Sequence, residues 1–438
     1  MLCLLLTPAH ARTRPHYGGT LRVETAGDAW QRPDGLARRL VYDGLTVLDA
    51  RGAVQPALAT EWSADNDAHR WQFKLRAGVR WQDGTALTSV NVVAALNAVC
   101  AANCPWTAVR AVGSSVVFVG DAPMPNLPAL LAGDEFLLAL TVSAEGKPPE
   151  GNVGTGPFAV TGFQNGVLAL KANETCWSGR PFADAVEVRV RRAVRDQWLD
   201  LSMGRADVVE VPVEALRQAQ QQHLRLLVAQ RASLLALQVN AAGALSNPQL
   251  RAALAAAVDR SALSNVVFQK QGEVTASLLP QALTGYGFLF SADRDLKHAH
   301  ELRGGITSPM LGLRVEGDGA MQLAGQRIAL DLSEAGFRVQ TAAIGAKPDL
   351  TLRKLPLGAN MPEAALDVLL RAAGEPAAKP DAGPAGLYKT EREELEQHTL
   401  VPLLDLPRAY AVGERVRDAR LSADGTPDLA QMALEDAP

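Results

Sequence analysis

The sequence lacks the features that mark several large classes of protein. No apolar run reaches the roughly 18 residues that a membrane-spanning helix needs, so we expect the mature protein to be soluble. A net charge of −4 gives no basic face, which argues against a nucleic-acid partner. Neither a Gly-x-Ser-x-Gly elbow nor a His-Glu-x-x-His pattern occurs. We therefore predict a protein that is not an enzyme and that carries no cofactor.

Cysteine is scarce, with four residues in 438. Cys3 falls in the apolar N-terminal run, and Cys176 stands beside Trp177, where a buried free thiol is expected. Cys100 and Cys104 bracket the short stretch AAN and could close a small disulfide loop in an oxidising compartment. A zinc site is the weaker interpretation of this pair, because two thiols without nearby histidines cannot complete a tetrahedral site.

Two further patterns resemble ligand-binding motifs but lack the residues that such motifs need. Residues 151–158 (GNVGTGPF) contain three glycines but no following Lys-Ser/Thr, so they predict a turn that uses positive φ and not a phosphate-binding loop. His298 and His300 are two residues apart, and side chains at that spacing do not share a helix face. No metal site is predicted.

The N-terminus has the character of a shortened export signal. Residues 2–6 are apolar and residues 9–11 (AHA) fit a small-x-small cleavage site, although the usual basic segment is missing. We expect residues 1–16 to form a leader and the mature chain to begin near Arg12.

Hydrophobic periodicity predicts the first structural elements. Residues 18–24 indicate a strand, and Trp71, Phe73 and Leu75 alternate with polar residues as in a half-buried strand. A turn is expected at residues 83–84 (Asp-Gly), after which Thr88 or Ser89 caps a helix.

Several segments in a fixed order resemble one known family. They are residues 18–22 (GGTLR), 43–45 (DGL), 56–62 (PALATEW), 73–88 (FKLRAGVRWQDGTALT) and 245–260 (LSNPQLRAALAAAVDR). Of these, residues 73–88 are the most specific. The chain resembles the family 5 extracellular solute-binding proteins, which are the dipeptide-, oligopeptide- and nickel-binding receptors of bacterial ABC importers.

The resemblance implies an α/β fold of the periplasmic-binding-protein type (type II), with two lobes, a hinge and a small inserted third subdomain. It divides the chain into lobe I (residues 17–45, 152–238 and 390–438), a small lobe (46–151) and an opposing lobe (239–389). The hinge crossings are expected at residues 239–240 and 388–401.

The candidate ligand-binding residues follow from this comparison. They are Thr25, Trp30, Thr155, Asn240, Tyr286 and Arg353. Trp30 lies in the loop after the first strand, where the family places ligand-facing groups. Residues 349–358 lack the acidic and aromatic segment with which family peptide receptors bind an α-amino group, and they carry Arg353 and Lys354 instead. This departure argues against a peptide with a free amino terminus and leaves an anionic or neutral solute open.

The resemblance implies a monomeric periplasmic protein that captures a small solute, possibly an oligopeptide, and delivers it to an ABC transporter permease. The alternative is a ligand sensor that has the same fold but no transport role. A clustered nucleophile and base would indicate an enzyme instead, and the sequence offers no such set.

The cysteine pattern makes a direct prediction. In protein taken from an oxidising compartment, Cys100 and Cys104 should resist alkylation until they are reduced, whereas Cys176 should remain an unpaired thiol. Quantitative thiol labelling of the unfolded, unreduced chain followed by mass spectrometry measures this. Free thiols at both Cys100 and Cys104 would show that their spacing is incidental.

Overall fold

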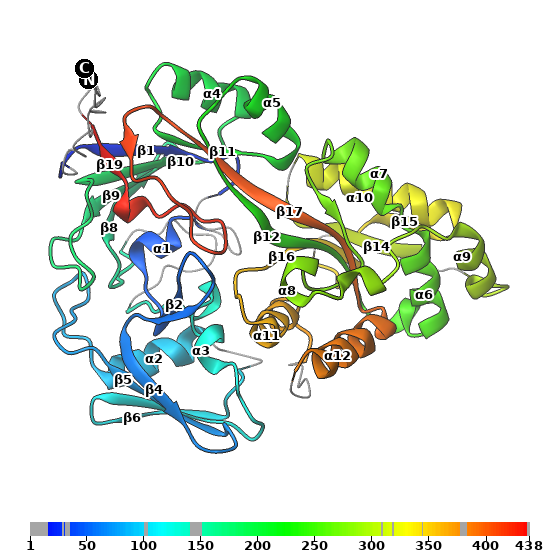
Figure 1. The fold of residues 1–438 in the computed structure, drawn as a ribbon, viewed down its shortest axis with the longest axis horizontal. Helices are drawn as coiled ribbons and strands as arrows, with labels where there is room; N and C mark the ends of the chain where they lie inside the picture. Colours follow the sequence, from blue (N-terminus) through cyan, green and yellow to red (C-terminus); the bar gives the residue numbers. More distant parts are fainter. Residues whose placement is uncertain are drawn as a thin grey trace, which may run out of the picture.

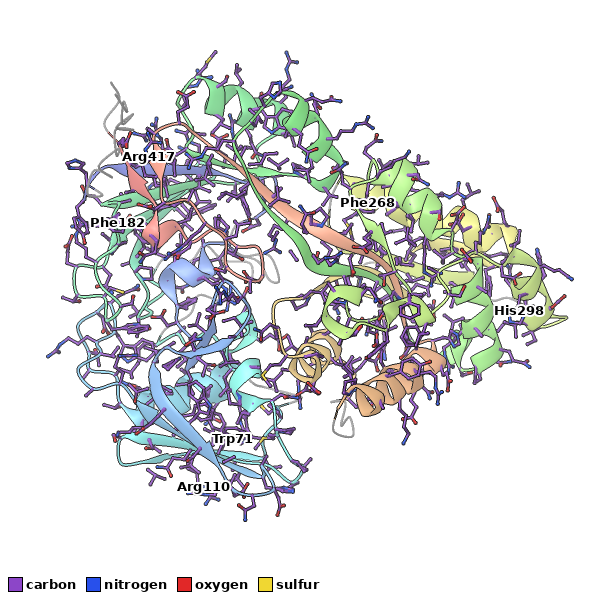
Figure 2. The ribbon with its side chains drawn as sticks, viewed as in Figure 1. Trp71, Arg110, Phe182, Phe268, His298 and Arg417 are labelled. Carbon is purple, nitrogen blue, oxygen red and sulfur yellow. The ribbon has the colours of Figure 1, made fainter. Side chains whose placement is uncertain are left out.

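The computed structural model describes residues 16–28, 30, 36–99, 104–140, 151–307, 310–317, 319–343, 345–376 and 383–435. One large sheet with helices on its faces runs through the molecule, and a separate small sheet stands to one side (Figure 1). Side chains fill the space between these layers (Figure 2). The predicted leader lies outside the described residues apart from its last position.

The large sheet has the strand order β15-β14-β16-β12-β17-β11-β1-β10-β9-β8, and β13 pairs with β17 outside this path. Strand β1 is parallel to β10 and β11, and β14 is parallel to β15 and β16, whereas the other pairs are antiparallel. We call β11, β1, β10, β9 and β8 the β1 half, and β15, β14 and β16 the β14 half. The strands are β1 (Thr20–Glu24), β8 (Phe158–Gln164), β9 (Val167–Ala172), β10 (Ala185–Arg189), β11 (Val208–Val211), β12 (Leu226–Val239), β13 (Glu273–Val274), β14 (Met310–Val315), β15 (Arg338–Thr341), β16 (Leu350–Pro356) and β17 (Leu400–Val412).

Strands β12 and β17 belong to both halves of this sheet. Near Ala229 they pair with each other beside β11, and from Ser233 onward they pair beside β16. The register between them shifts between these two residues. The change of halves therefore occurs inside both strands. The predicted hinge crossings, residues 239–240 and 388–401, lie at or beyond the far ends of these strands, because both strands are longer than their sequence patterns suggested. As hinge positions they stay predictions.

Helices cover both faces of the β14 half. Along β12, Leu235 and Leu237 pack into the core beneath α6 and α10, whereas Leu234 and Ala236 pack beneath α11. This alternation follows from the two-residue period of a strand and explains the nearly continuous apolar run there. The helices are α1 (Arg38–Val41), α2 (Ser89–Val99), α3 (Leu127–Leu130), α4 (Val194–Ser202), α5 (Leu216–Gln221), α6 (Pro248–Ala257), α7 (Arg260–Ala262), α8 (Gln281–Thr284), α9 (Leu296–Arg303), α10 (Ala320–Glu334), α11 (Pro362–Ala372) and α12 (Pro384–Gln397).

The small sheet has its own aromatic core. Its order is β4 (Ala59–Ala64), β5 (Arg70–Leu75), β7 (Ser115–Val119) and β6 (Ala108–Val112). Phe73 and Phe118 meet edge to face at 5.4 Å, and the same core encloses the fully buried Trp81. The tryptophans in the family-like N-terminal segments therefore serve packing.

The elements predicted from periodicity are present. Residues of β5 alternate between exposed and buried, as the sequence pattern indicated. Helix α2 begins at Ser89, and the Oγ1 atom of Thr88 accepts a hydrogen bond from the backbone N–H of Asn91 at 3.3 Å, which is the expected cap. Gly84 adopts φ +87° in the predicted turn.

The glycine-rich segment 151–158 differs from its prediction. Gly151 has positive φ, but Gly154 and Gly156 do not. Their small size is needed for a different reason: a Cβ on Gly154 would collide with the carbonyl oxygen of Val41, and one on Gly156 would lie 2.7 Å from the carbonyl carbon of Val41. This segment packs directly against the backbone at the end of α1.

We predict that Gly154→Ala lowers the free energy of unfolding by about 1–3 kcal/mol, the range for overpacking a filled site. Urea unfolding measures the loss. Gly162→Ala is the matched control, because a Cβ at Gly162 meets nothing within 4 Å. Equal stability of the two variants would contradict the close approach at Gly154.

Candidate ligand-binding site

A recess of about 260 Å³ forms where chain segments far apart in the sequence meet. One wall is the turn between β2 (Thr46–Leu48) and β3 (Val54–Pro56), and another is the loop that follows β16. The segment around α8 and a C-terminal loop complete it. The lining residues are Ala50, Arg51, Pro280, Ala282, Leu283, Leu357, Gly358, Ala359, Asn360 and Ala423. The recess thus draws on the predicted small lobe, the predicted opposing lobe and the C-terminal part of lobe I.

A tight backbone contact closes one side of the recess. The N–H of Asn360 donates to the carbonyl oxygen of Gly52 at 3.1 Å. Gly52 has φ +78°, and a Cβ there would lie 2.6 Å from the carbonyl oxygen of Gly358, so glycine is needed at this position. On α11, the carbonyl oxygen of Glu363 accepts from Nδ2 of Asn126 at 3.3 Å. The β2–β3 region therefore touches the β14 half directly.

A charged cluster lies behind the recess. Nη2 of Arg39 is 2.7 Å from Oδ1 of Asp134, and Nε of Arg39 is 3.4 Å from Oδ2 of Asp424. Burial opposes the charge on Arg39, but Asp134 and Asp424 raise its pKa above the ordinary value. Burial likewise opposes ionisation of Asp424, yet Arg39 and Arg408 lower its pKa. The cluster fixes the loop that carries Ala423 against α1.

Asp405 is a buried carboxylate on β17, close to the change of halves. It pairs with Leu234 of β12 and with Glu273 of β13 in the sheet register, and Glu273 forms an ion pair with Arg231 at 2.7 Å. Burial and the nearby Glu273 carboxylate raise the pKa of Asp405 to about 7, against the opposing effect of Arg231. Oδ1 of Asp405 has no hydrogen-bond partner in the part of the chain that the structure describes.

The three candidate residues in and near the β1 half already have intramolecular partners. The hydroxyl of Thr25 donates to the carbonyl of Gly27 at 3.0 Å, and the buried Thr155 donates to Oδ2 of Asp43 at 2.8 Å. The ring of Trp30 meets the Tyr42 ring at 5.7 Å in an edge-on arrangement. Their ligand-binding roles stay predictions, and the recess is lined by other residues.

The other three candidates lie after β12, after α8 and in β16. Oδ1 of Asn240 accepts from the N–H of Ala242 at 3.3 Å, and Tyr286 is buried with its ring 5.2 Å from that of Tyr388. Nε of Arg353 lies 3.1 Å from Oε2 of Glu316. The structure therefore does not gather the six predicted residues around one space, and the roles of these three also stay predictions.

Arg51 and Asn360 are the polar residues of the recess that the sequence did not single out. Both are exposed and lie in short loops beside glycines, Gly52 and Gly358. A glycine in a loop allows another backbone segment to approach closely, but no local pattern shows which distant loop that segment belongs to.

The cysteine and metal predictions can be placed in part. Cys176 is a buried free thiol, as predicted, and burial raises its pKa. Cys104 is disulfide-bonded, whereas its predicted partner Cys100 lies outside the described residues. Within the described ranges, no group of three or more His, Cys, Asp or Glu side chains is placed to hold a metal ion.

The helices of the described part of the chain are all too short or too polar to span a bilayer.

Comparison with known proteins identifies relatives of the whole arrangement. The profile of the bacterial extracellular solute-binding proteins, family 5, matches residues 53–350, which is more than half of the chain. A probable di/tripeptide-binding protein 5 of Pseudomonas aeruginosa is 24% identical over 352 residues, covering 70% of this chain and 67% of that protein. A probable D,D-dipeptide-binding periplasmic protein, DdpA of Escherichia coli, is 23% identical over 53% of this chain and 49% of its own length.

Solved structures agree with the fold. The binding protein AgaA from A. tumefaciens R10, in complex with agropinic acid, superposes with a TM-score of 0.81 over 96% of this chain and 99% of that one, at 19% identity. The likeness extends over both halves of the sheet and the small sheet.

The raised pKa of Asp405 predicts how stability depends on pH. Because the folded pKa of about 7 lies above the model-peptide value of 3.8, the contribution of Asp405 to stability is fully present below about pH 4. It is lost as the pH rises through 7, by about 4 kcal/mol in total. Asp405→Asn should therefore gain stability relative to the wild type between pH 4 and pH 8 in urea unfolding.

As the control, Asp67→Asn, which changes an exposed carboxylate, should follow the wild type. A pH-independent difference between Asp405→Asn and the wild type would exclude this role.

Proposed function

The chain belongs to the bacterial extracellular solute-binding proteins, family 5, and on that premise we propose that it captures a small solute between two lobes and delivers it to the permease of an ABC importer. Two observations support this proposal. The family profile matches residues 53–350, and β12 and β17 connect the two halves of the sheet. Two connecting strands allow a hinge, and lobes that close on a ligand bind it by excluding water.

The recess supports a solute-binding role at the meeting of these parts. Its volume of about 260 Å³ is just below the range of roughly 300–1,000 Å³ for drug-sized ligands, so a small solute fits best. The contact between Gly52 and Asn360 is of the kind that closure would make and opening would break. A ligand that binds the closed arrangement better shifts the population toward it.

The solute we propose carries a carboxylate and has the size of a dipeptide or a smaller acid. Arg51 is exposed and lines the recess without an ion pair among the described residues. A guanidinium binds a carboxylate through two parallel hydrogen bonds. Two relatives are named for dipeptides and one structural neighbour holds agropinic acid, and these ligands share an acid group.

The remaining parts of the proposal concern setting and partners. We place the mature protein in the periplasm as a monomer that works with a permease, without catalytic activity of its own and without a nucleic-acid partner. The net charge of −4 supports the last point, because a nucleic-acid surface is normally basic. The lobe boundaries predicted from the sequence are part of this proposal.

The proposal is tested first by mass spectrometry of solutes that are retained when the native protein is purified, and then by calorimetry with dipeptides and small acids. Arg51→Ala should weaken binding of the retained solute by about 1.5–3 kcal/mol, the range for a hydrogen bond to a charged group. Arg110→Ala removes an exposed arginine from β6, the edge strand of the small sheet, which does not line the recess, and should leave the affinity unchanged.

An equal loss in both arginine variants would mean that general charge and not the recess determines binding. A protein that binds the solute but whose deletion leaves cellular uptake unchanged would support the sensor alternative over transport. Conversion of the retained solute by the purified protein would contradict a pure binding role.

A further inference from the structure

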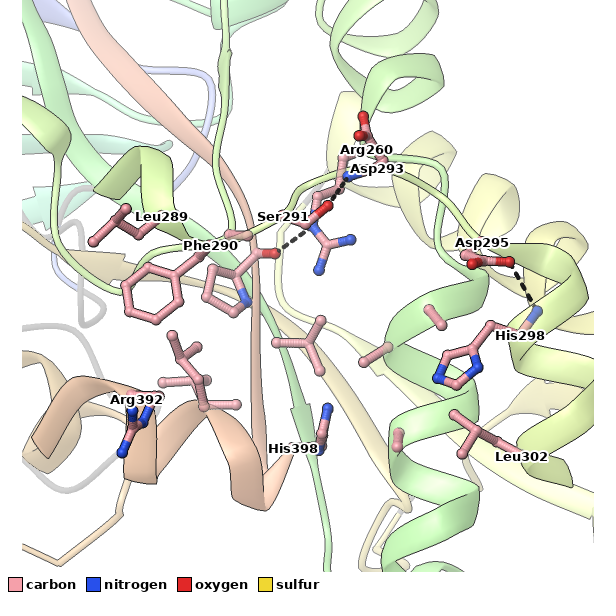
Figure 3. A pocket seen from close by; sticks show the side chains of 18 of the residues that line it. Arg260, Leu289, Phe290, Ser291, Asp293, Asp295, His298, Leu302, Arg392 and His398 are labelled. Carbon is pink, nitrogen blue, oxygen red and sulfur yellow. Dashed lines mark hydrogen bonds between the residues drawn. The ribbon is translucent and has the colours of Figure 1, made fainter. Parts of the chain in front are cut away.

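A larger cavity, of about 570 Å³, lies beside the beginning of β17 and shares no lining residue with the recess. Its floor is the beginning of β17, and its walls come from α6, α9, α12 and the loop before α9 (Figure 3). The walls are mixed, with alanine, leucine and aromatic side chains beside charged and polar ones. The rings of Phe290 and Tyr388 stack at 5.5 Å on one side.

Arg260 reaches into this cavity from α7 and is only 6% exposed. Figure 3 shows its guanidinium pointing into the space that Phe290, His298 and His398 border. Its Nε donates to the carbonyl oxygen of Pro402 at 2.8 Å. In the described part of the chain no carboxylate lies within ion-pair distance of it. Burial lowers its pKa to about 10, as expected for a cation without an acidic partner.

The other buried arginine of this region shows what is missing. Arg251, also 6% exposed, donates to three backbone carbonyls, those of Leu245, Ser246 and Gln397. Arg260 has one such acceptor, and its two terminal nitrogens face the cavity. A buried charge is costly unless it is paired or fully hydrogen-bonded.

Two of the nearby carboxylates already serve as helix caps. Asp259 caps α7 by accepting from the N–H of Ala262 at 2.8 Å, and Asp295 caps α9 by accepting from the N–H of His298 at 2.8 Å. Asp293 and Asp295 also line the cavity. Their charges oppose added negative charge, so the space suits an anion of charge −1 better than a dianion.

We propose that this cavity is a second ligand site that binds a small monocarboxylate with an apolar body. The carboxylate would pair with the two free nitrogens of Arg260, and the body would pack against Phe290 and Tyr388. Two parallel N–H···O bonds are the geometry in which guanidinium and carboxylate fit best. The site is separate from the recess and does not depend on the function proposed for it.

Benzoate is the probe, and benzamide, which has the same shape without the charge, is its control. We expect benzoate to raise the melting temperature of the full chain with increasing concentration and benzamide to have no effect. Calorimetry should show that Arg260→Gln weakens benzoate binding at least about tenfold, since hydrogen bonds to charged groups are lost. Arg110→Ala, which changes an exposed arginine of β6 that lines neither the cavity nor the recess, should bind benzoate as the wild type does.

Since Arg260→Gln could fail to fold, a second variant keeps the test decisive. Ala252 lines the cavity, and Ala252→Trp should fill it and abolish benzoate binding while Arg260 stays in place. Equal binding of benzoate and benzamide, unchanged affinity in either cavity variant, or tighter binding of inorganic phosphate than of benzoate would overturn the proposal. Crystals soaked in 4-bromobenzoate should show the bromine signal beside Phe290 and Tyr388.

Discussion

The hydrogen-bonded pairing of β12 with β17 is the interaction on which the rest of the structure depends. These two strands are the only path in the described main sheet by which the β1 half is hydrogen-bonded to the β14 half. Their register shifts between Ala229 and Ser233, so the ladder is interrupted where the halves meet. An irregular stretch in an otherwise continuous ladder is a place where two rigid bodies can change their relative angle at small energetic cost.

Partly and fully buried charges are stabilised in two ways around this pair of strands. Near the recess, Arg39 is held between two carboxylates, and each of these opposite charges stabilises the other against the cost of burial. At the beginning of β17, Arg260 has a single carbonyl acceptor and an adjoining cavity. The first arrangement fixes loops in position, whereas the second leaves hydrogen-bonding capacity for a molecule from outside.

The two cavities differ in how they are built. The recess depends on contacts between distant chain segments, so its shape follows the relative position of the small sheet and the β14 half. The larger cavity lies among helices that pack on one sheet half and share its core. A change of angle at β12 and β17 would therefore alter the recess strongly and the larger cavity little.

The sequence by itself determined the family, the α/β class and many local elements, because these depend on neighbouring residues. The alternation in β5 and the cap at Thr88 are examples, since each is encoded within a few positions. The full length of β12 and β17 was missed because a strand buried on both faces has no polar alternation to mark its ends. Only the tertiary structure decided which loops meet at Gly52 and Asn360, and why Gly154 must be small. Both features depend on contacts between segments that are far apart in the chain. The residues around a glycine or a loop arginine do not show which distant segment it will contact.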